Sequence, residues 1–189
     1  MPDHQLAVVR LDATARDDFF RVHSAANEAG WCFCVAWWTP TWTGWAERTA
    51  QQNLAQREAL FAQGEYDGYL LYADGLPVGW CQVGPRDRLA KLVGQYRLVP
   101  DPATWAITCF QIAPASRRQG LATALLHGVL RDLRARGVRR VEAFPKRGEG
   151  LGADDVWTGP EQLFVAAGFR LVRDDPSRPV LAWDTTDGA

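Results

Sequence analysis

The stretch IAPASRRQGLAT, residues 112–123, joins a buried strand to the most regular helix of the chain. The strand is predicted over Trp105–Ile112, an apolar run that Pro114 ends. The helix is predicted over Gln119–Arg136, where leucine, valine and alanine recur at three- and four-residue steps, and Gly137 ends it. The chain therefore passes from a core strand directly into the first turn of a long amphipathic helix.

This turn has the composition of an anion site, because the first turn of a helix presents unpaired N–H groups and the positive end of the helix dipole. Gly120 and Ala122 leave the backbone open to close approach, Arg117 and Arg118 add positive charge, and Thr123 adds a hydroxyl donor. These features predict a pyrophosphate site. The alternative is a helix start whose small residues only permit close packing on a sheet. A Walker loop and a Gly-x-Gly-x-x-Gly dinucleotide fingerprint are both absent from the sequence.

The flanking sequence alternates short strands and helices. Strands are predicted at Leu6–Leu11, Tyr69–Ala73, Val78–Val83, Val138–Phe144, Phe169–Val172 and Val180–Trp183. Helices are predicted at Ala15–Ala29, Trp45–Ala62 and Pro160–Ala167, and irregular segments at Trp31–Gly44, Gly84–Pro102 and Lys146–Gly159. The pair Asp74-Gly75 between two apolar runs indicates a hairpin. Because no linker or repeat divides the chain, residues 1–189 are predicted to form one α/β domain.

The bulk composition disfavours several classes of function. The net charge of −1 provides no basic surface for nucleic acid, and no apolar run is long enough to span a membrane. The N-terminus has no signal-peptide pattern, so we expect a cytoplasmic protein. The four cysteines are Cys32, Cys34, Cys81 and Cys109. Their spacing favours buried free thiols over a zinc site, so no metal is expected.

Two segments resemble the GNAT superfamily of N-acetyltransferases. Arg117–Ala122 matches that family's Gln/Arg-x-x-Gly-x-Gly/Ala motif, which holds the pyrophosphate of coenzyme A, and Gly159–Phe169 is similar to its late helix. The order of elements is also similar, most clearly over residues 105–172. The resemblance implies an α/β (α+β) fold of GNAT type, with a mixed sheet of about six or seven strands and about four helices. Trp31–Cys34 and Val141–Pro145 resemble a bacterial subgroup without a settled substrate.

The resemblance further implies an enzyme that transfers the acetyl group of acetyl-CoA to a primary amine of a small molecule or peptide. In that family the amine attacks the thioester directly. The residues expected at the cofactor are Phe110, Gln111, Ile112, Arg117, Arg118, Gln119, Gly120, Leu121, Ala122, Thr123 and Phe164. The strand at Phe110–Ile112 is expected to hold the pantetheine arm and to offer an N–H donor to the oxyanion that forms on the carbonyl. Acetyl-CoA and an amine are thus the expected partners.

The acid and the base of this reaction have less support. Many relatives carry a tyrosine four residues before the Gly-Phe pair, where this chain has Phe164, which has no proton to donate. Glu142 is the best remaining carboxylate, although an ion-paired strand residue is an equal interpretation. Cys109 is a second candidate, but core packing is the favoured interpretation of its apolar surroundings. A coenzyme A-binding sensor or partner-binding module with weak or lost catalysis is the alternative function.

Five of the nine tryptophans fall in one window, which contains Trp31, Trp37, Trp38, Trp42 and Trp45. The resemblance places this tryptophan window at the acceptor pocket, where aromatic rings suit an apolar body or a cationic amine. The other interpretations are a hydrophobic lid over the core and, if the rings are exposed, a homodimer surface.

Overall fold

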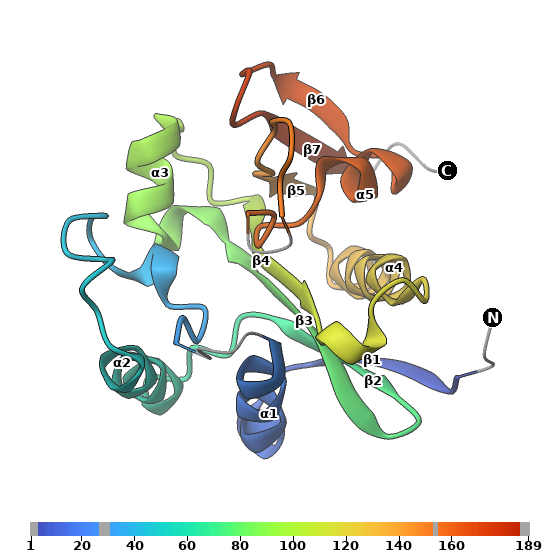
Figure 1. The fold of residues 1–189 in the computed structure, drawn as a ribbon. Coiled ribbons are helices and arrows are strands. Elements are labelled where there is room, and N and C mark those ends of the chain that lie inside the picture. Colours follow the sequence, from blue (N-terminus) through green and yellow to red (C-terminus); the bar gives the residue numbers. More distant parts are fainter. Residues whose placement is uncertain (1–3, 27–30, 153–154, 186–189) are drawn as a thin grey trace.

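The computed structural model describes residues 4–26, 31–152 and 155–185, and its centre is a seven-stranded mixed sheet (Figure 1). The strands are β1 (Leu6–Arg10), β2 (Tyr69–Ala73), β3 (Leu76–Pro85), β4 (Thr104–Ile112), β5 (Arg140–Ala143), β6 (Arg170–Arg173) and β7 (Val180–Asp184). The helices are α1 (Arg16–Ala26), α2 (Ala50–Ala62), α3 (Ala90–Tyr96), α4 (Leu121–Ala135) and α5 (Glu161–Ala166). The strand order is β1-β2-β3-β4-β5-β7-β6, so the expected mixed sheet of six or seven strands is confirmed.

The strand pairing changes from antiparallel to parallel between β4 and β5, in the middle of the sheet. β1 to β4 pair antiparallel in sequence order, and β4 then pairs parallel with β5. A parallel pair needs a crossover connection, which α4 provides. The β2–β3 hairpin turns through Asp74 (φ 51°) and Gly75 (φ 80°), and two successive left-handed residues are what an Asp-Gly hairpin turn requires. The predicted hairpin is therefore confirmed.

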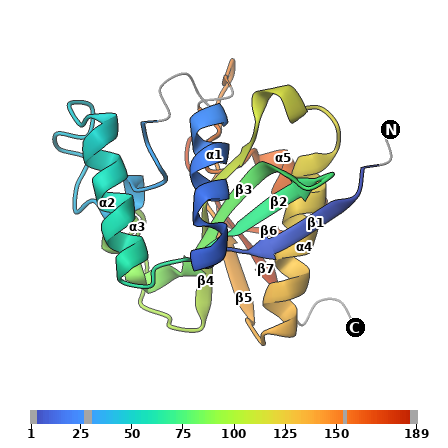
Figure 2. The same cartoon turned by 90° about the horizontal axis from the view of Figure 1, so that it is seen from below.

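Helices cover both faces of the sheet, with α4 and α5 on one face and α1, α2 and α3 on the other (Figures 1 and 2). On the first face, the leucines of α4 pack against Cys81 of β3 and its neighbours. On the second face, the ring of Phe19 in α1 meets Trp80 of β3 edge to face, with 4.9 Å between centroids. Successive side chains of β3 thus point to opposite helix layers, as the pleat of a strand requires.

One irregularity in β4 shapes the middle of the sheet. Cys109 pairs with Gln82 and Ile107 pairs with Val83, so Thr108 is an extra residue of β4 and forms a bulge. The pairing of β4 with β5 ends at Ile107. Beyond the bulge, the end of β4 keeps its hydrogen bonds to β3, while its other edge is not paired with β5.

The helix α3 lies in a segment that the sequence analysis predicts to be irregular, Gly84–Pro102. Leu92 and Tyr96 anchor this helix in the core with 3% or less of their surface exposed. A short helix has little stability of its own, and Gly94 lowers its helix propensity further, so tertiary packing decides that it forms. The described residues therefore contain five α-helices where about four are expected.

Two predicted helix boundaries also need comment. The second helix begins at Ala50 and not at Trp45, because Thr49 and Gln52 form a capping box that fixes its start. The predicted end of the first helix lies within residues 27–30, which are outside the described part of the chain. No helix among the described residues is both long enough and apolar enough to cross a lipid bilayer.

Two helical glycines provide a matched test of how closely α4 packs on the sheet. A Cβ at Gly128 would lie 2.7 Å from the Cβ of Val8, whereas a Cβ at Gly94 would meet nothing within 4 Å. We expect Gly128→Ala to lower the free energy of unfolding by about 1–3 kcal/mol through overpacking. Gly94→Ala should raise it by roughly 0.5–1 kcal/mol, because alanine favours a helix. Urea denaturation measures both changes, and equal shifts for the two variants would contradict the packing.

Candidate functional site

A cavity of about 1520 Å³ lies against the end of β4, beyond the bulge. The described residues that line it are His23, Ser24, Trp31, Cys32, Phe33, Cys34, Ala36, Trp42, Trp45, Gln95, Cys109, Phe110, Gln111, Ile112, Pro114, Ser116, Arg117, Arg118, Gly120, Leu121, Ala122, Val156, Trp157, Pro160 and Arg178. Pockets for a single small ligand usually hold about 300–1,000 Å³, so this cavity has room for two substrates.

The first turn of α4 gives this cavity a positive end. Gly120 is the N-cap residue with φ 76°, and no side chain caps the helix among the described residues. The N–H groups of the first turn are therefore open to a ligand. Arg118 is also left-handed, with φ 62°, and Arg117 Nε donates to the carbonyl oxygen of Ile112 at 3.0 Å. Backbone donors, the helix dipole and two guanidinium groups together suit a pyrophosphate.

The free edge of β4 forms one wall of the cavity. Ala113 N–H donates to β3 at 2.8 Å, so the alternate residues Phe110 and Ile112 direct their N–H groups away from β3 and toward the opening. The N–H of Phe110 donates to the carbonyl oxygen of Trp157 at 2.8 Å. The side-chain nitrogen of Gln111 is buried and has no hydrogen-bond partner among the described residues. A ligand arm that contains amide groups would find partners along this wall.

Most residues that the sequence analysis predicts at a cofactor do line the cavity. They are Phe110, Gln111, Ile112, Arg117, Arg118, Gly120, Leu121 and Ala122, and the candidate Cys109 is there as well. Gln119 and Thr123 are not among the lining residues. The side chain of Gln119 lies 3.3 Å from His4, measured between Oε1 and Nε2, and Thr123 is exposed on α4.

Phe164 is fully buried in the core instead of facing the cavity. Its ring packs against Phe110 and Phe169, with centroids 6.4 and 5.3 Å apart. A Cβ at Gly159 would lie 2.5 Å from the edge of this ring, so the backbone closes over it. The expected contact of Phe164 with the cofactor is therefore corrected to core packing, because neighbouring aromatic rings enclose the side chain.

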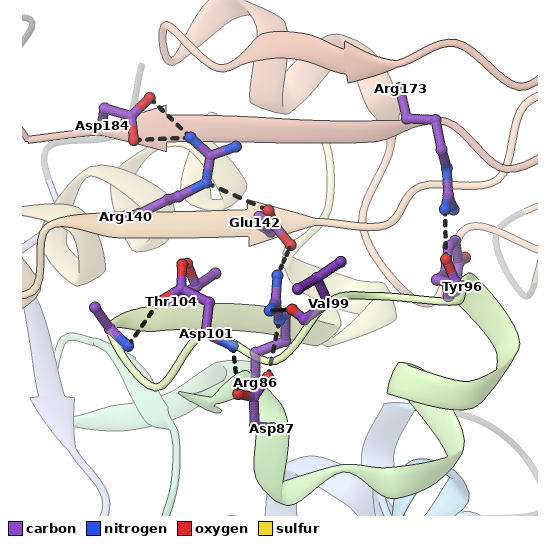
Figure 3. A network of polar contacts seen from close by, with 11 residues as sticks. Arg86, Asp87, Tyr96, Val99, Asp101, Thr104, Arg140, Glu142, Arg173 and Asp184 are labelled. Atoms are coloured by element: carbon purple, nitrogen blue, oxygen red, sulfur yellow. Dashed lines mark hydrogen bonds and ion pairs between the residues drawn. The ribbon is translucent and has the colours of Figure 1, made fainter.

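Glu142 also lies outside the cavity lining. On β5, with 6% of its surface exposed, it accepts hydrogen bonds from Arg86 Nη1 at 2.9 Å and Arg140 Nε at 3.3 Å (Figure 3). Arg140 continues to Asp184 at 3.1 Å, and Arg86 donates to the carbonyl oxygen of Val99 at 2.5 Å. Both carboxylate oxygens of Glu142 thus have a cationic partner. The geometry favours the ion-paired interpretation over a base that acts in the cavity.

A cluster of one histidine and two cysteines lines the cavity next to the bulge. His23 of α1 has its Nδ1 2.8 Å from the carbonyl oxygen of Phe19 and its Nε2 3.0 Å from Cys34 Sγ. The sulfur of Cys34 also lies 2.7 Å from the sulfur of Cys109, within reach of a thiol hydrogen bond. Burial opposes ionisation of Cys34, but the Cys109 hydrogen bond, His23 and the nearby Arg57 outweigh it, so the pKa of the Cys34 thiol lies well below its ordinary value.

The other thiols around the cavity have the opposite tendency. The hydrogen bond to Cys34 and burial raise the pKa of Cys109 well above its ordinary value. Burial raises the pKa of Cys32 to about 12. Cys34 is therefore the thiol that ionises most readily, and once it is a thiolate, Cys109 is the hydrogen-bond donor of the pair. In the described part of the chain, no three His, Cys, Asp or Glu residues are grouped as metal ligands would be.

The backbone that carries Cys34 is left-handed at two successive residues, Phe33 (φ 43°) and Cys34 (φ 51°). Arg57 of α2, only 1% exposed, donates from Nε to the Phe33 carbonyl oxygen at 3.0 Å and from Nη2 to that of Cys34 at 2.6 Å. The sequence analysis predicts Cys34 to be a buried thiol and does not predict its contact with His23. The feature of the sequence that points to this contact is the position of His23 on the apolar side of its helix, where its ring faces the core.

The tryptophan window divides between the cavity and the core. Trp31, Trp42 and Trp45 line the cavity, and Trp37 is 2% exposed in the core. Lys91 of α3, which is not a lining residue, places Nζ 3.6 Å from the centroid of the Trp42 ring. The chain's own ammonium group therefore occupies one of the aromatic faces that the sequence analysis assigns to a cationic amine.

Comparison with known proteins was made by sequence and by structure. The sequence profile of the acetyltransferase (GNAT) family matches residues 31–153. PaiA N-acetyltransferase of Thermoplasma acidophilum, solved with coenzyme A, has a TM-score of 0.56 at 12% identity, over 95% of this chain and 99% of that one. The ribosomal-protein-S18-alanine N-acetyltransferase of Escherichia coli has a TM-score of 0.55 at 15% identity, over 96% and 94%. YncA of Salmonella typhimurium, solved with acetyl-CoA, has a TM-score of 0.54 at 15% identity, over 97% and 96%. No curated protein matches the chain by sequence.

The profile match covers more than half of the chain, and it includes the bulged strand, the first turn of α4 and the parallel strand pair. This chain belongs to the GNAT family of acetyltransferases. The resemblance inferred from Arg117–Ala122 is thereby confirmed. The solved structures, at 12–15% identity, show that the fold is shared.

The ion pairs of Glu142 lead to a stability prediction. Glu142→Gln removes one of the two carboxylates that face the buried guanidinium of Arg86 and leaves Asp87, 3.2 Å from Arg86 Nε, as the other, so we expect the free energy of unfolding to fall by about 1–3 kcal/mol. Glu149→Gln, at an exposed position, is the matched control and should change it by less than about 0.5 kcal/mol. Urea denaturation measures both variants. An unchanged stability of Glu142→Gln would contradict the ion-paired interpretation.

Lys91 leads to a prediction about pH. Burial lowers the pKa of Lys91 from 10.5 to about 8. Between about pH 8 and 10.5 only the unfolded chain keeps the Lys91 proton, so Lys91 contributes a rise of the free energy of unfolding with pH, opposite to the fall that the raised pKa values of Cys32 and Cys109 contribute. Lys91→Met should remove that rise, and Lys146→Met should retain it. Denaturation across this pH range tests the assignment, and identical pH profiles for the two variants would exclude it.

Proposed function

We propose that this chain transfers the acetyl group of acetyl-CoA to a primary amine of a small molecule or a peptide. The observation that carries the proposal is the continuity of one cavity, which extends from the uncapped first turn of α4 along the free edge of β4 to the tryptophan window. Relatives of the same fold that were solved with coenzyme A or acetyl-CoA support this choice of donor.

Each part of the cavity has a distinct task in this proposal. The first turn of α4, with Arg117 and Arg118, holds the pyrophosphate of the donor. Gln111 Nε2 and the N–H of Ile112 bind the amides of the pantetheine arm, which brings the thioester to the bulge. The amine enters beside Trp31, Trp42 and Trp45. Holding both reactants in one cavity makes the transfer effectively unimolecular, which contributes much of the rate enhancement.

Direct attack of the amine on the thioester is the route with the fewest steps, and it is the route expected from the family. The N–H of Phe110 at the free edge of β4 would stabilise the oxyanion in exchange for its present hydrogen bond to the Trp157 carbonyl oxygen. The leaving thiolate needs little help from an acid, because a thiol has a pKa of about 8.5. The absence of a hydroxyl at Phe164 is therefore compatible with transfer.

The second candidate function is a coenzyme A-binding sensor without turnover. It is favoured by the burial of Phe164 in an apolar core and by the ion pairs of Glu142, which together remove the acid and the base that sequence comparison offers. Calorimetric titration with acetyl-CoA, followed by a thiol-release assay against a panel of amines, separates the two. Binding with thiol release for an amine supports the enzyme, and binding without release for every amine supports the sensor.

The turn at Gly120 gives the sharpest prediction for the donor site. Gly120→Glu places a carboxylate where the pyrophosphate binds, so we expect calorimetry to detect no binding of coenzyme A. Gly120→Gln has the same bulk without the charge and should bind coenzyme A weakly but detectably. Both substitutions also impose a left-handed φ of 76° on a residue with a Cβ.

A glycine at the other end of the same helix controls for that backbone strain. Gly137 is left-handed with φ 77°, and a Cβ there meets nothing within 4 Å. Gly137→Glu should therefore reproduce the strain and retain full affinity for coenzyme A. Unaltered affinity in a folded Gly120→Glu chain would remove the basis of the proposed function.

A further inference from the structure

We propose that Cys34 is a catalytic nucleophile that takes the acetyl group from acetyl-CoA as a protein thioester and then passes it to the amine. This proposal rests on the proposed use of acetyl-CoA as donor. It replaces direct attack on acetyl-CoA by two successive transfers at the same end of the cavity. Three features of the molecule support Cys34 as the nucleophile: the strained turn, the partners of His23 and the environment of the sulfur.

The turn at Cys34 is held in a conformation that non-glycine residues rarely adopt. Phe33 and Cys34 are both left-handed, and the buried guanidinium of Arg57 donates to the carbonyl oxygens of both. Strain of this kind persists only where the surroundings enforce it, and it concentrates at reactive positions. Here its result is that the Cys34 sulfur meets His23 and Cys109 at the cavity wall.

The hydrogen bonds of His23 show which group can react. A carbonyl oxygen only accepts, so His23 Nδ1 donates its proton to the Phe19 carbonyl oxygen at 2.8 Å. His23 Nε2 then faces Cys34 Sγ at 3.0 Å. Both ring nitrogens are thus engaged while Cys34 is unmodified, so His23 can accept a proton from an amine only after Cys34 has become a thioester. A thiol in contact with an oriented imidazole is the arrangement of an activated nucleophile.

The electrostatic surroundings of Cys34 favour the thiolate. His23 faces it from α1, Arg57 from α2, Cys109 from β4 and Cys32 from its own segment. The pKa of the Cys34 thiol lies well below its ordinary value in spite of burial, because Cys109 donates a hydrogen bond and His23 and Arg57 supply positive charge. A reactive cysteine needs this kind of electropositive site.

The two transfers balance in atoms and protons. Cys34 Sγ, with its proton on His23 Nε2, attacks the acetyl carbonyl carbon; a C–S bond to Cys34 forms as the C–S bond to coenzyme A breaks. The leaving thiolate takes the proton from His23. The amine nitrogen then attacks the Cys34 thioester, the C–N bond forms, the C–S bond to Cys34 breaks, and the amine proton passes to His23 Nε2. After the second transfer Cys34 is again a thiolate and His23 Nε2 again carries the proton, and no further reactant is consumed.

Mass spectrometry of the intact chain tests this proposal without any knowledge of the amine. The protein is kept in a phosphine reductant, mixed with acetyl-CoA alone and quenched in acid. Because no amine is present, the acetyl group stays on the chain. We expect one acetyl group per chain, located on Cys34 by peptide mapping and removed by neutral hydroxylamine, as a thioester would be. An equimolar burst of free coenzyme A should accompany it.

Calorimetric titration of the same sample with acetyl-CoA separates this proposal from the proposed function. Binding of acetyl-CoA with no acetyl group on Cys34 overturns the nucleophile and leaves the use of acetyl-CoA in place. No binding overturns the proposed function, and the nucleophile with it.

Three variants locate the chemistry. Cys34→Ser keeps the size and the hydrogen bonds but ionises far less, so it should lose the label and the burst. Cys81→Ala is the control, since that thiol lies in the core and is not among the lining residues of the cavity, and it should label at Cys34 as the unaltered chain does. His23→Gln should slow the burst by about 100-fold, because the proton acceptor is gone. A full hydroxylamine-sensitive label on Cys34→Ser would place the acetyl group elsewhere and overturn the proposal.

Discussion

The bulge at Thr108 is the constraint on which the site depends. The extra residue of β4 comes directly after Ile107, the last residue that pairs with β5, and beyond it β4 continues to pair with β3 alone. The edge that is set free becomes a wall of the cavity, and the same strand leads from Ile112 into the first turn of α4. The bulge also anchors the tryptophan window in the core, because the indole N–H of Trp37 donates to the Thr108 carbonyl oxygen at 3.2 Å. If β4 were paired with β5 along its whole length, no room would remain for a ligand between the two strands.

The helices α1 and α2 take part in the chemistry as well as covering the sheet. α1 brings His23 to the Cys34 sulfur, α2 brings Arg57 to the carbonyl groups around it, and β4 brings Cys109 from the opposite side. Each left-handed residue of the turn costs on the order of 1–3 kcal/mol, which charge-assisted hydrogen bonds from a buried guanidinium offset. The thiol is thus held by contacts with several elements, so its position depends on the whole core and not on the flexibility of its own segment.

Local patterns in the sequence predict the parts of this protein that local physics determines. The β2–β3 hairpin, the helix α4 and the open turn at Gly120 follow from turn chemistry, periodicity and small residues, and the structure contains all three. The contact of Cys34 with His23 and Cys109 could not be predicted, because the two cysteines are 75 residues apart and meet only when the segment before α2 folds over β4. The choice between a base and an ion pair at Glu142 could not be made from the sequence for a related reason, since no local pattern shows that Arg86 lies opposite it.

The central claim is that one cavity joins the first turn of α4 to the Cys34 sulfur through the free edge of β4. A crystal structure of the chain with coenzyme A tests it most directly. The account predicts the pyrophosphate on the N–H groups of the turn at Gly120, the pantetheine arm along β4, and the coenzyme A sulfur beside Cys34 and Cys109. Coenzyme A bound away from that turn, or with its sulfur far from Cys34, would contradict it.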